Sequence, residues 1–256
     1  MVSISVYAFA SVFATVIFAS STGATLLCDA ELPVGEYYRP CGDKVSGRFD
    51  AKTPFRRSPC PGINTLANHG YINRDGKNIT RAQLKQAVMI HYKAEDAAAE
   101  AFLGPLPDVF DLNMFTSHNK QEHDASLVHT DLYLGENPSE FNRDLLEDVF
   151  RRADNNGNFG VQQLGELRKD RLATCLAQNP NCTFEEHQST LAGGEAALIL
   201  TGFGNVATST VDKDTLRSFL EFERFPSDYA RPEVLTLNGV VATARKVTAI
   251  ATQVTA

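Results

Sequence analysis

The first 28 residues of this chain contain no charged side chain, and the first charged residue is Asp29. A nearly continuous apolar run covers residues 6–19, and the small-residue site Thr22-Gly23-Ala24 follows it. This pattern excludes an ordinary domain surface and predicts a signal peptide over residues 1–24. A signal anchor is the alternative, since the uncharged stretch is long enough to span a bilayer. Cleavage would give a secreted, extracellular protein without membrane attachment.

The chain also lacks any block of like charges or basic patch, although its formal net charge is −7. This excludes the electrostatic footprint of a nucleic-acid-binding protein. Internal repeats, linkers and low-complexity tracts are missing as well. With 43% hydrophobic and 21% charged residues, residues 25–256 are expected to form one domain with a sizeable core.

Cysteine is scarce, and its number is odd, at five. Proximity in sequence pairs Cys28 with Cys41 and Cys175 with Cys182, although other connectivities and free buried thiols stay open. Cys60 is left over. In an oxidising compartment, an unpaired cysteine needs a functional reason.

Two sequons for N-glycosylation agree with the secretory route, at Asn78 and Asn181. Sequons also arise by chance, so they corroborate secretion without deciding it.

Alternating strand patterns are also hard to find, which favours a mainly α fold with little or no β structure. Helix starts are predicted from their N-cap residues: Thr80 for a helix to about residue 102, Ser139, Thr183 with Glu186 as a capping box, and Asp212. Residues 154–158 resemble the start of a calcium loop, but the glycine at the sixth loop position and the terminal bidentate glutamate are missing, so the segment is interpreted as a turn before a helix.

Residues 59–72 read PCPGINTLANHGYI and place Cys60 directly before a predicted helix. Pro61 suits the first helical position, where a missing N–H costs nothing. Cys60 then lies at the positive end of the helix dipole, an environment that lowers the pKa of a thiol. The resulting thiolate would be a nucleophile or a metal ligand. A cysteine-nucleophile hydrolase would need a base, and His69 is about two and a half turns away.

Residues 122–131 read EHDASLVHTD. Glu122, His123 and Asp124 bring three ionisable groups together, and Ser126 adds a hydroxyl oxygen. Such a cluster suits a hard cation or acid–base chemistry. Taken alone, a solvated acidic surface would be the simpler interpretation.

Glu195 opens an otherwise apolar helical run over residues 195–200. The helix dipole stabilises a carboxylate at a helix N-terminus, which is the structural explanation. The functional explanation is a carboxylate in an apolar pocket, where desolvation raises its proton affinity. Phe203, further along, is a candidate for lining a substrate pocket and equally a candidate core residue.

Together these segments resemble the heme-thiolate peroxidase family, which includes chloroperoxidase and the unspecific peroxygenases. The family hallmark, PCP followed by G-x-N-x-x-A-N-H-G-Y, is nearly complete over residues 59–71. Residues 122–126 match its E-H-D-x-S element, Glu195 matches its later glutamate, and residues 221–226 are similar to its F-x-x-E-R-L-P stretch. The resemblance spans about residues 30–232 and implies a single compact helical domain that encloses a heme.

The resemblance implies that heme b is bound with Cys60 as the axial thiolate ligand of iron, between Pro59 and Pro61. It also implies that Glu195 is the acid–base group. Glu195 would take a proton from hydrogen peroxide and return it to the oxygen that leaves as water.

The resemblance further implies one Mg²⁺ near a heme propionate. Its ligands would be the Glu122 carboxylate, the His123 backbone carbonyl and the Ser126 hydroxyl. His123 would hydrogen-bond Glu195, while Asp124 would orient the imidazole.

The implied activity is that of a peroxygenase or peroxidase, using H2O2 to oxygenate C–H bonds of small organic substrates or to oxidise phenols, with halides as a further option. Longer peroxygenases carry an arginine beside the glutamate and an E-G-D triplet, so His123 and the short chain resemble the His-type group. His129 stands where many relatives carry arginine, and Asp228-Tyr229 replaces a G-W pair. The alternative is a secreted heme-binding or interaction protein that has lost turnover, which would be expected to lose Cys60 or Glu195 first.

Overall fold

The structure is a computed structural model and describes residues 32–135, 137–229 and 234–253. The predicted signal peptide at residues 1–24 lies outside these residues, and so does Cys28. Its predicted bond with Cys41, which is exposed, therefore stays a prediction. Among the described residues there is no helix with the length and apolar character that a bilayer span requires.

Helices dominate the described part of the chain, which confirms the mainly α prediction. They are α1 (Pro61–Asn68), α2 (Arg81–His91), α3 (Asp96–Leu103), α4 (Arg143–Arg151), α5 (Val161–Gln178), α6 (Glu186–Leu198), α7 (Lys213–Leu220) and α8 (Leu237–Ala251). Short 3₁₀ turns occur at Gly42–Lys44 and Leu112–Thr116, and a π-helical turn, η4 (Ile199–Phe203), continues α6.

The β structure consists of short two-stranded pairs. Strand β1 (Val45–Ser46) pairs in parallel with β2 (Phe55–Arg56), β3 (Ile79–Thr80) pairs antiparallel with β4 (Val109–Phe110), and β5 (Asn158–Phe159) pairs antiparallel with β6 (Val211–Asp212). Each strand is two residues long, so these pairs tie loops together and build no layer.

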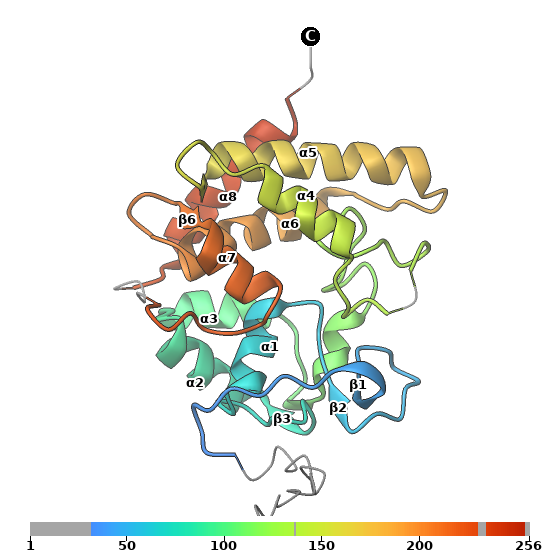
Figure 1. The fold of residues 1–256 in the computed structure, drawn as a ribbon, viewed down its shortest axis with the longest axis vertical. Helices are drawn as coiled ribbons and strands as arrows, with labels where there is room; N and C mark the ends of the chain where they lie inside the picture. The colour runs from blue at the N-terminus through green and yellow to red at the C-terminus, as the bar shows by residue number, and fades with distance from the viewer. Residues whose placement is uncertain (1–31, 136, 230–233, 254–256) are drawn as a thin grey trace, which may run out of the picture.

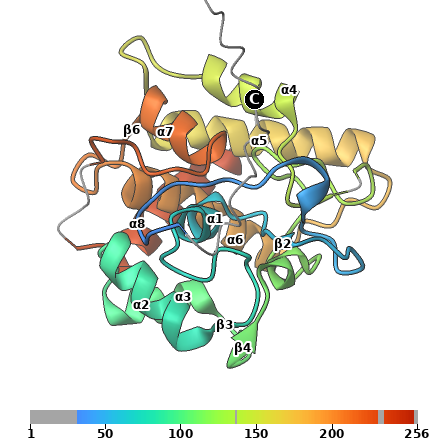
Figure 2. The ribbon, with the colours of Figure 1, turned by 60° about the horizontal axis from the view of Figure 1, so that its bottom comes forward.

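The helices form two groups with α7 between them (Figure 1). Helix α8 packs against both α5 and α6 in one group, and α2 packs against α3 in the other. Helix α1 contacts α7 and lies near the middle of the molecule in both ribbon views (Figures 1 and 2). The helix that carries the PCP motif is therefore surrounded by other elements.

Two of the predicted helix starts are confirmed. The Thr80 hydroxyl caps α2 by accepting the N–H of Gln83 at 3.1 Å. The Asp212 carboxylate caps α7 by accepting the N–H of Thr215 at 2.8 Å. Each cap depends on contacts within three residues, which the sequence alone can specify.

The other two predicted starts are wrong because other contacts bind the groups involved, a local one at Ser139 and a distant one at Thr183. Ser139 donates its hydroxyl to Asn137 at 2.9 Å, and Asn142 caps α4 instead. The N–H of Thr183 donates to the Asp124 carboxylate at 2.9 Å. Helix α6 therefore begins at Glu186, with Glu185 as its N-cap residue.

The predicted single helix to residue 102 is also wrong, because it is broken between α2 and α3. Lys93 adopts a φ of 55°, and the backbone there pairs with a distant segment. The Lys93 carbonyl accepts the N–H of Leu235 at 2.9 Å, and the Leu235 carbonyl accepts the N–H of Glu95 at 3.0 Å. Periodicity within residues 80–102 carries no sign of this pairing.

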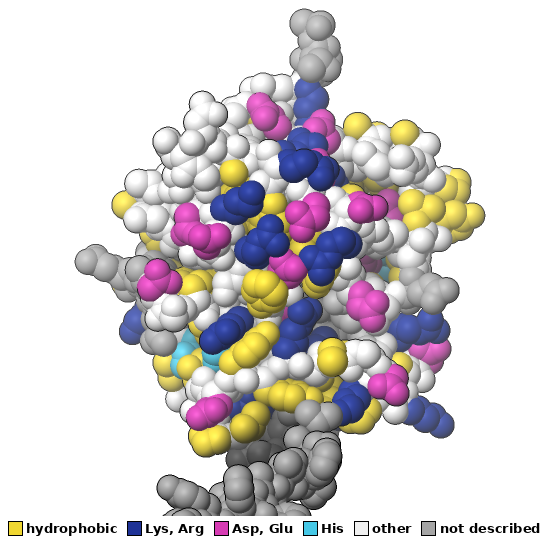
Figure 3. All heavy atoms as spheres, in the orientation of Figure 1, with side chains coloured by type: hydrophobic (Ala, Val, Ile, Leu, Met, Phe, Trp, Pro, Cys, Tyr) yellow, Lys and Arg dark blue, Asp and Glu magenta, His cyan; other side chains and the backbone are white. Residues whose placement is uncertain are grey.

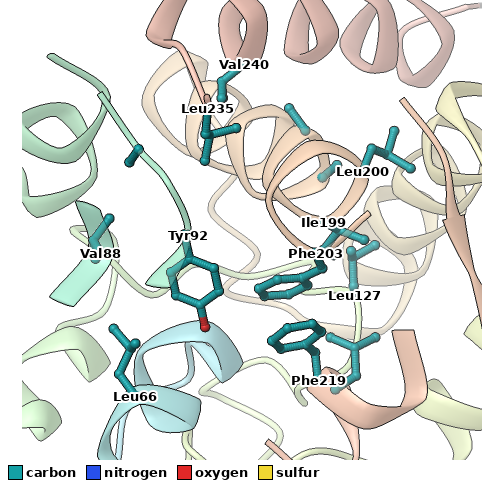
Figure 4. Close-up of a cluster of buried hydrophobic side chains, with 14 of the residues drawn as sticks. Leu66, Val88, Tyr92, Leu127, Ile199, Leu200, Phe203, Phe219, Leu235 and Val240 are labelled. Carbon is teal, nitrogen blue, oxygen red and sulfur yellow. The ribbon is translucent and has the colours of Figure 1, made fainter. Parts of the chain in front are cut away.

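Aromatic side chains fill the space between α1, α7 and η4 (Figure 4). The rings of Phe203 and Phe219 stack with centroids 3.9 Å apart, and Tyr92 donates its hydroxyl to the Gly62 carbonyl at 2.7 Å. A Cβ on Gly62 would lie 3.3 Å from the Phe203 ring. The first turn of the Cys60 helix is thus held by close packing and one buried hydrogen bond.

Acidic and basic side chains are interspersed over α4 and α7 on the face drawn in Figure 3. Glu221 pairs there with Arg143 at 2.5 Å and with Arg217 at 2.6 Å. These exposed pairs connect helices of the outer surface and contribute little individually.

Candidate active site

Cys60 caps the N-terminus of α1 and Pro61 is its first residue, as the sequence predicted. The prediction of a lowered thiol pKa is wrong for the protein without a bound cation. Burial raises the pKa of Cys60 to about 11, and the charges of Glu195 and Glu223 add to this, against the backbone N–H groups of Ile63 and Gly62. A bound cation would relieve this cost, so the site favours a metal-bound thiolate over a free one.

Glu195 lies in the last turn of α6, not at a helix start as predicted. One carboxylate oxygen, Oε2, lies 3.2 Å from His123 Nε2 and accepts a hydrogen bond from Arg168 Nη2 at 2.8 Å. Burial would raise the pKa of Glu195, but these two partners outweigh it and lower the pKa to about 2. The Glu195 side chain is nevertheless 46% exposed, so a small molecule can reach its carboxylate.

His123 is held between two acceptors. Nδ1 donates to the Asp124 carbonyl at 2.6 Å, and Nε2 faces the Glu195 carboxylate. Burial lowers the pKa of His123, but Glu195 outweighs burial and the net shift is upward. Because the carbonyl and the carboxylate can only accept hydrogen bonds, they favour the imidazolium form of His123. Asp124 orients the ring through its backbone, while its carboxylate accepts the N–H of Thr183.

Arg168 is the functional residue that the sequence analysis missed. It lies on α5, is 5% exposed, and donates to the Ala125 carbonyl at 3.3 Å as well as to Glu195. The sequence contains a sign of this role. Leu164, Leu167 and Arg168 share the buried face of α5, and an arginine on a buried face needs an acidic partner. The chain thus combines the histidine and the arginine that the sequence analysis treated as alternatives.

The proposed magnesium ligands lie on a tight turn in which Ala125 adopts a φ of 58°. Glu122 is 5% exposed and accepts a hydrogen bond from His118 Nδ1 at 2.6 Å. Burial raises the pKa of Glu122 more than His118 lowers it. The carboxylate is therefore incompletely compensated, as a cation ligand would be. His118, which carried no recognisable signal in the sequence, is its partner.

Ser126 contacts His129, with Oγ 3.2 Å from Nδ1. Burial lowers the pKa of His129 to about 4, so this histidine is neutral at physiological pH. His129 therefore cannot supply the permanent positive charge of the arginine that many relatives carry there.

A sequence model of the family described as "Peroxidase, family 2" matches residues 36–234. The chain belongs to this peroxidase family. The heme-thiolate resemblance inferred from the motifs is thereby confirmed, and it covers most of the described residues.

Individual relatives agree with the family match. An aromatic peroxygenase of Cyclocybe aegerita is 30% identical over 234 residues, covering 78% of this chain and 62% of the relative. An aromatic peroxygenase of Coprinellus radians is 26% identical, covering 68% and 78%. A chloroperoxidase of Leptoxyphium fumago is 45% identical over 47 residues, which is 18% of this chain and 13% of the relative. The chain spans less than two thirds of the length of the first of these relatives.

A disulfide between Cys175 and Cys182 fixes the turn around His123 in this peroxidase-family chain. Thr183, next to the bond, binds the Asp124 carboxylate, and Asn179 within the loop donates to Asp131 at 3.1 Å. The disulfide therefore connects the end of α5 to both sides of the turn.

The remaining predicted residues are placed as follows. Phe203 is 9% exposed, and its packing on Phe219 and Gly62 is that of a core residue beside the Cys60 helix. His69 is a bonded structural histidine, with Nδ1 2.9 Å from the Gly35 carbonyl. Asn78 and Asn181 are both exposed, so each is accessible to a glycosyltransferase.

The residues of this chain fit a heme with an axial thiolate. The Cys60 sulfur has N–H donors from the start of α1 on one side, and the Glu195 charge acts on it through space. The two groups are therefore within electrostatic reach of each other, one as a soft ligand for iron and the other as an ionised carboxylate.

Proposed function

We propose that this protein is a secreted heme-thiolate enzyme that uses hydrogen peroxide to oxygenate C–H bonds of small organic molecules or to oxidise phenols, with halides as further candidate substrates. The observation that carries the proposal is the Glu195 carboxylate, which the side chains of His123 and Arg168 hold within electrostatic reach of Cys60. A surface carboxylate needs no such support.

In this mechanism, Cys60 holds the heme and Glu195 moves the proton. When bound, the heme supplies the redox-active iron that oxidises the substrate at the expense of peroxide. Glu195 is ionised, so it accepts a proton from hydrogen peroxide and then donates it to the oxygen that leaves as water. His123 and Arg168 keep Oε2 fixed, which leaves Oε1 for the transfer.

The low pKa of Glu195 indicates how His123 and Arg168 affect its proton transfer. A carboxylate with a pKa of about 2 is ionised throughout the physiological range but is a weak base. The partners therefore favour the return of the proton to the leaving oxygen, where a strong acid is an advantage.

We also propose that Mg²⁺ binds at the turn of residues 122–126, held by Glu122, the His123 carbonyl and Ser126. These are hard oxygen donors of the kind that Mg²⁺ prefers. The buried Glu122 carboxylate, whose pKa is raised, supports this assignment because a divalent cation would compensate its charge.

A lapsed enzyme that serves only as a binding protein is the second interpretation, and it is less favoured. Such a protein has no need for a buried arginine and a buried imidazolium on one carboxylate. This chain keeps both, together with Cys60.

The experiment that tests the proposal is the CO difference spectrum of the reduced, purified protein. A strongly red-shifted Soret band is expected, because a thiolate opposite CO donates more electron density than an imidazole does. A histidine-type band, or a protein that binds no heme, would contradict the proposal.

Replacing Ser126 with alanine tests the magnesium site. The S126A variant should retain less Mg²⁺ after gel filtration than the wild type, as measured by elemental analysis, because one oxygen ligand is lost. S117A is a nearby serine control and should retain wild-type Mg²⁺. Equal Mg²⁺ content in all three proteins would remove Ser126 from the ligand set.

A further inference from the structure

A buried glutamate from the C-terminal motif contacts the helix that carries Cys60. The Glu223 side chain is 9% exposed. Its carboxylate accepts hydrogen bonds from Asn64 Nδ2 at 2.6 Å and from Arg39 Nε at 2.9 Å. Asn68, one turn further along α1, donates to the Glu223 carbonyl at 3.1 Å. Glu223 therefore binds α1 through both its side chain and its backbone.

Asn64 extends this contact to the turn before α1. Its Oδ1 accepts the Ser58 N–H at 2.9 Å and the Ser58 hydroxyl at 3.0 Å. The Ser58 oxygen in turn accepts the Cys60 N–H at 3.1 Å. Glu223, Asn64, Ser58 and Cys60 thus form one continuous series of hydrogen bonds, and the turn that presents the sulfur cannot rotate without breaking it.

The series also directs which amides reach the sulfur. Because Ser58 takes the N–H of Cys60, this amide is not available to the sulfur of its own residue. The N–H groups of Gly62 and Ile63 act on the sulfur instead and lower the pKa of the Cys60 thiol. Ser58 thereby fixes the turn that presents the sulfur to these amides, and such groups around a ligand atom tune a thiolate-bound iron.

The backbone at Glu223 adopts a conformation that is unfavourable for glutamate. Its φ is 48°, in the left-handed region that glycine and asparagine adopt most easily. Glycine would remove the strain, and asparagine would still accept a hydrogen bond. Neither of these residues would supply the negative charge that glutamate places at this position.

We propose that Glu223 is a positioning residue for the Cys60 sulfur and that its charge increases electron donation from the sulfur to the iron. The inference rests on the proposed heme-thiolate function and deepens it. Glu223 is within electrostatic reach of Cys60. Reduction of the iron adds an electron near this carboxylate, so Glu223 makes reduction less favourable and stabilises the ferric state.

The test compares heme-loaded wild type with E223Q and E221Q. Glutamine can still accept from Asn64 but carries no charge. Glu221 is the matched control because it belongs to the same motif, but its carboxylate pairs with Arg143 and Arg217. The ferric/ferrous midpoint potential of E223Q should shift to a more positive value, and its CO-bound Soret band should move from the wild-type position. Both properties of E221Q should equal those of the wild type.

The result that overturns the proposal is an E223Q protein with the thiolate CO band and the potential of the wild type. A wild type without the thiolate band would instead overturn the proposed function, and this inference with it. The two failures are thus distinguished by the wild-type spectrum alone.

A second variant keeps the proposal testable if E223Q does not retain heme. R39Q removes the cation that neutralises Glu223, from a side chain that is 31% exposed. With the carboxylate less compensated, the midpoint potential should shift to a more negative value. A midpoint potential that stays unchanged or becomes more positive in R39Q would overturn the proposal.

Discussion

The E195Q variant should bind heme normally and lose nearly all peroxide-dependent turnover. Glutamine keeps the shape of the side chain and its hydrogen-bonding oxygen but cannot carry the proton between the two peroxide oxygens. General acid–base groups contribute about 10²–10⁴-fold to rate, so kcat/KM for H2O2 should fall by about that factor. Steady-state kinetics on a phenolic substrate, with the heme content measured in parallel, provide the comparison.

The control for this variant is E186Q, an exposed glutamate in the first turn of the same helix. It removes the same charge and should leave kcat/KM unchanged. Turnover by E195Q at the wild-type rate would remove Glu195 from the mechanism. Loss of heme from E195Q would show that the residue acts in cofactor retention.

The R168Q variant should lose activity at acidic pH while keeping more of it near neutrality. Arg168 and His123 together lower the pKa of Glu195 to about 2. Without the guanidinium, the pKa rises, so Glu195 becomes protonated and inactive at a higher pH than in the wild type. An opposite charge at this range shifts a carboxyl pKa by about 1–3 units. The acid limb of the kcat/KM profile should move upward by a similar amount.

R168K is the conservative control, because it retains a positive charge near Glu195 and should leave the acid limb close to its wild-type position. A structural defect would instead reduce activity by the same factor at every pH. If the profile of R168Q has the wild-type acid limb, Arg168 does not set the protonation of Glu195.

The R168Q variant also shows how far His123 alone can hold Glu195 ionised. Both side chains bind the same carboxylate oxygen, so neither alone determines the ionisation of Glu195. An enzyme whose catalytic carboxylate has two cationic partners should tolerate the loss of one partner better than an enzyme whose carboxylate has a single partner.

Features that depend on a few neighbouring residues followed from the sequence. Cys60 lies before a helix that starts at Pro61 because proline fixes the backbone of the first turn. Thr80 and Asp212 cap their helices because the donors lie within three residues. The family motifs added Glu195 and the 122–126 turn, which local patterns alone left ambiguous.

Features that depend on contacts between distant residues could not be predicted from the sequence. The helix predicted over residues 80–102 is broken by pairing with Leu235, and Thr183 is diverted from its predicted cap by Asp124. In both places a backbone group that looked free in the local sequence is bound by a segment far along the chain. Local propensity is a weak determinant under such competition.

The sequence by itself determined which groups are present: a cysteine at a helix start, an acidic turn and a later glutamate. Only the tertiary structure decided their chemical state. Packing brings Arg168 and His123 onto Glu195 from 27 and 72 residues away, and burial raises the pKa of Cys60 despite the helix dipole. Charge and desolvation act through space, so the properties of these groups are set by neighbours that the order of residues does not place beside them.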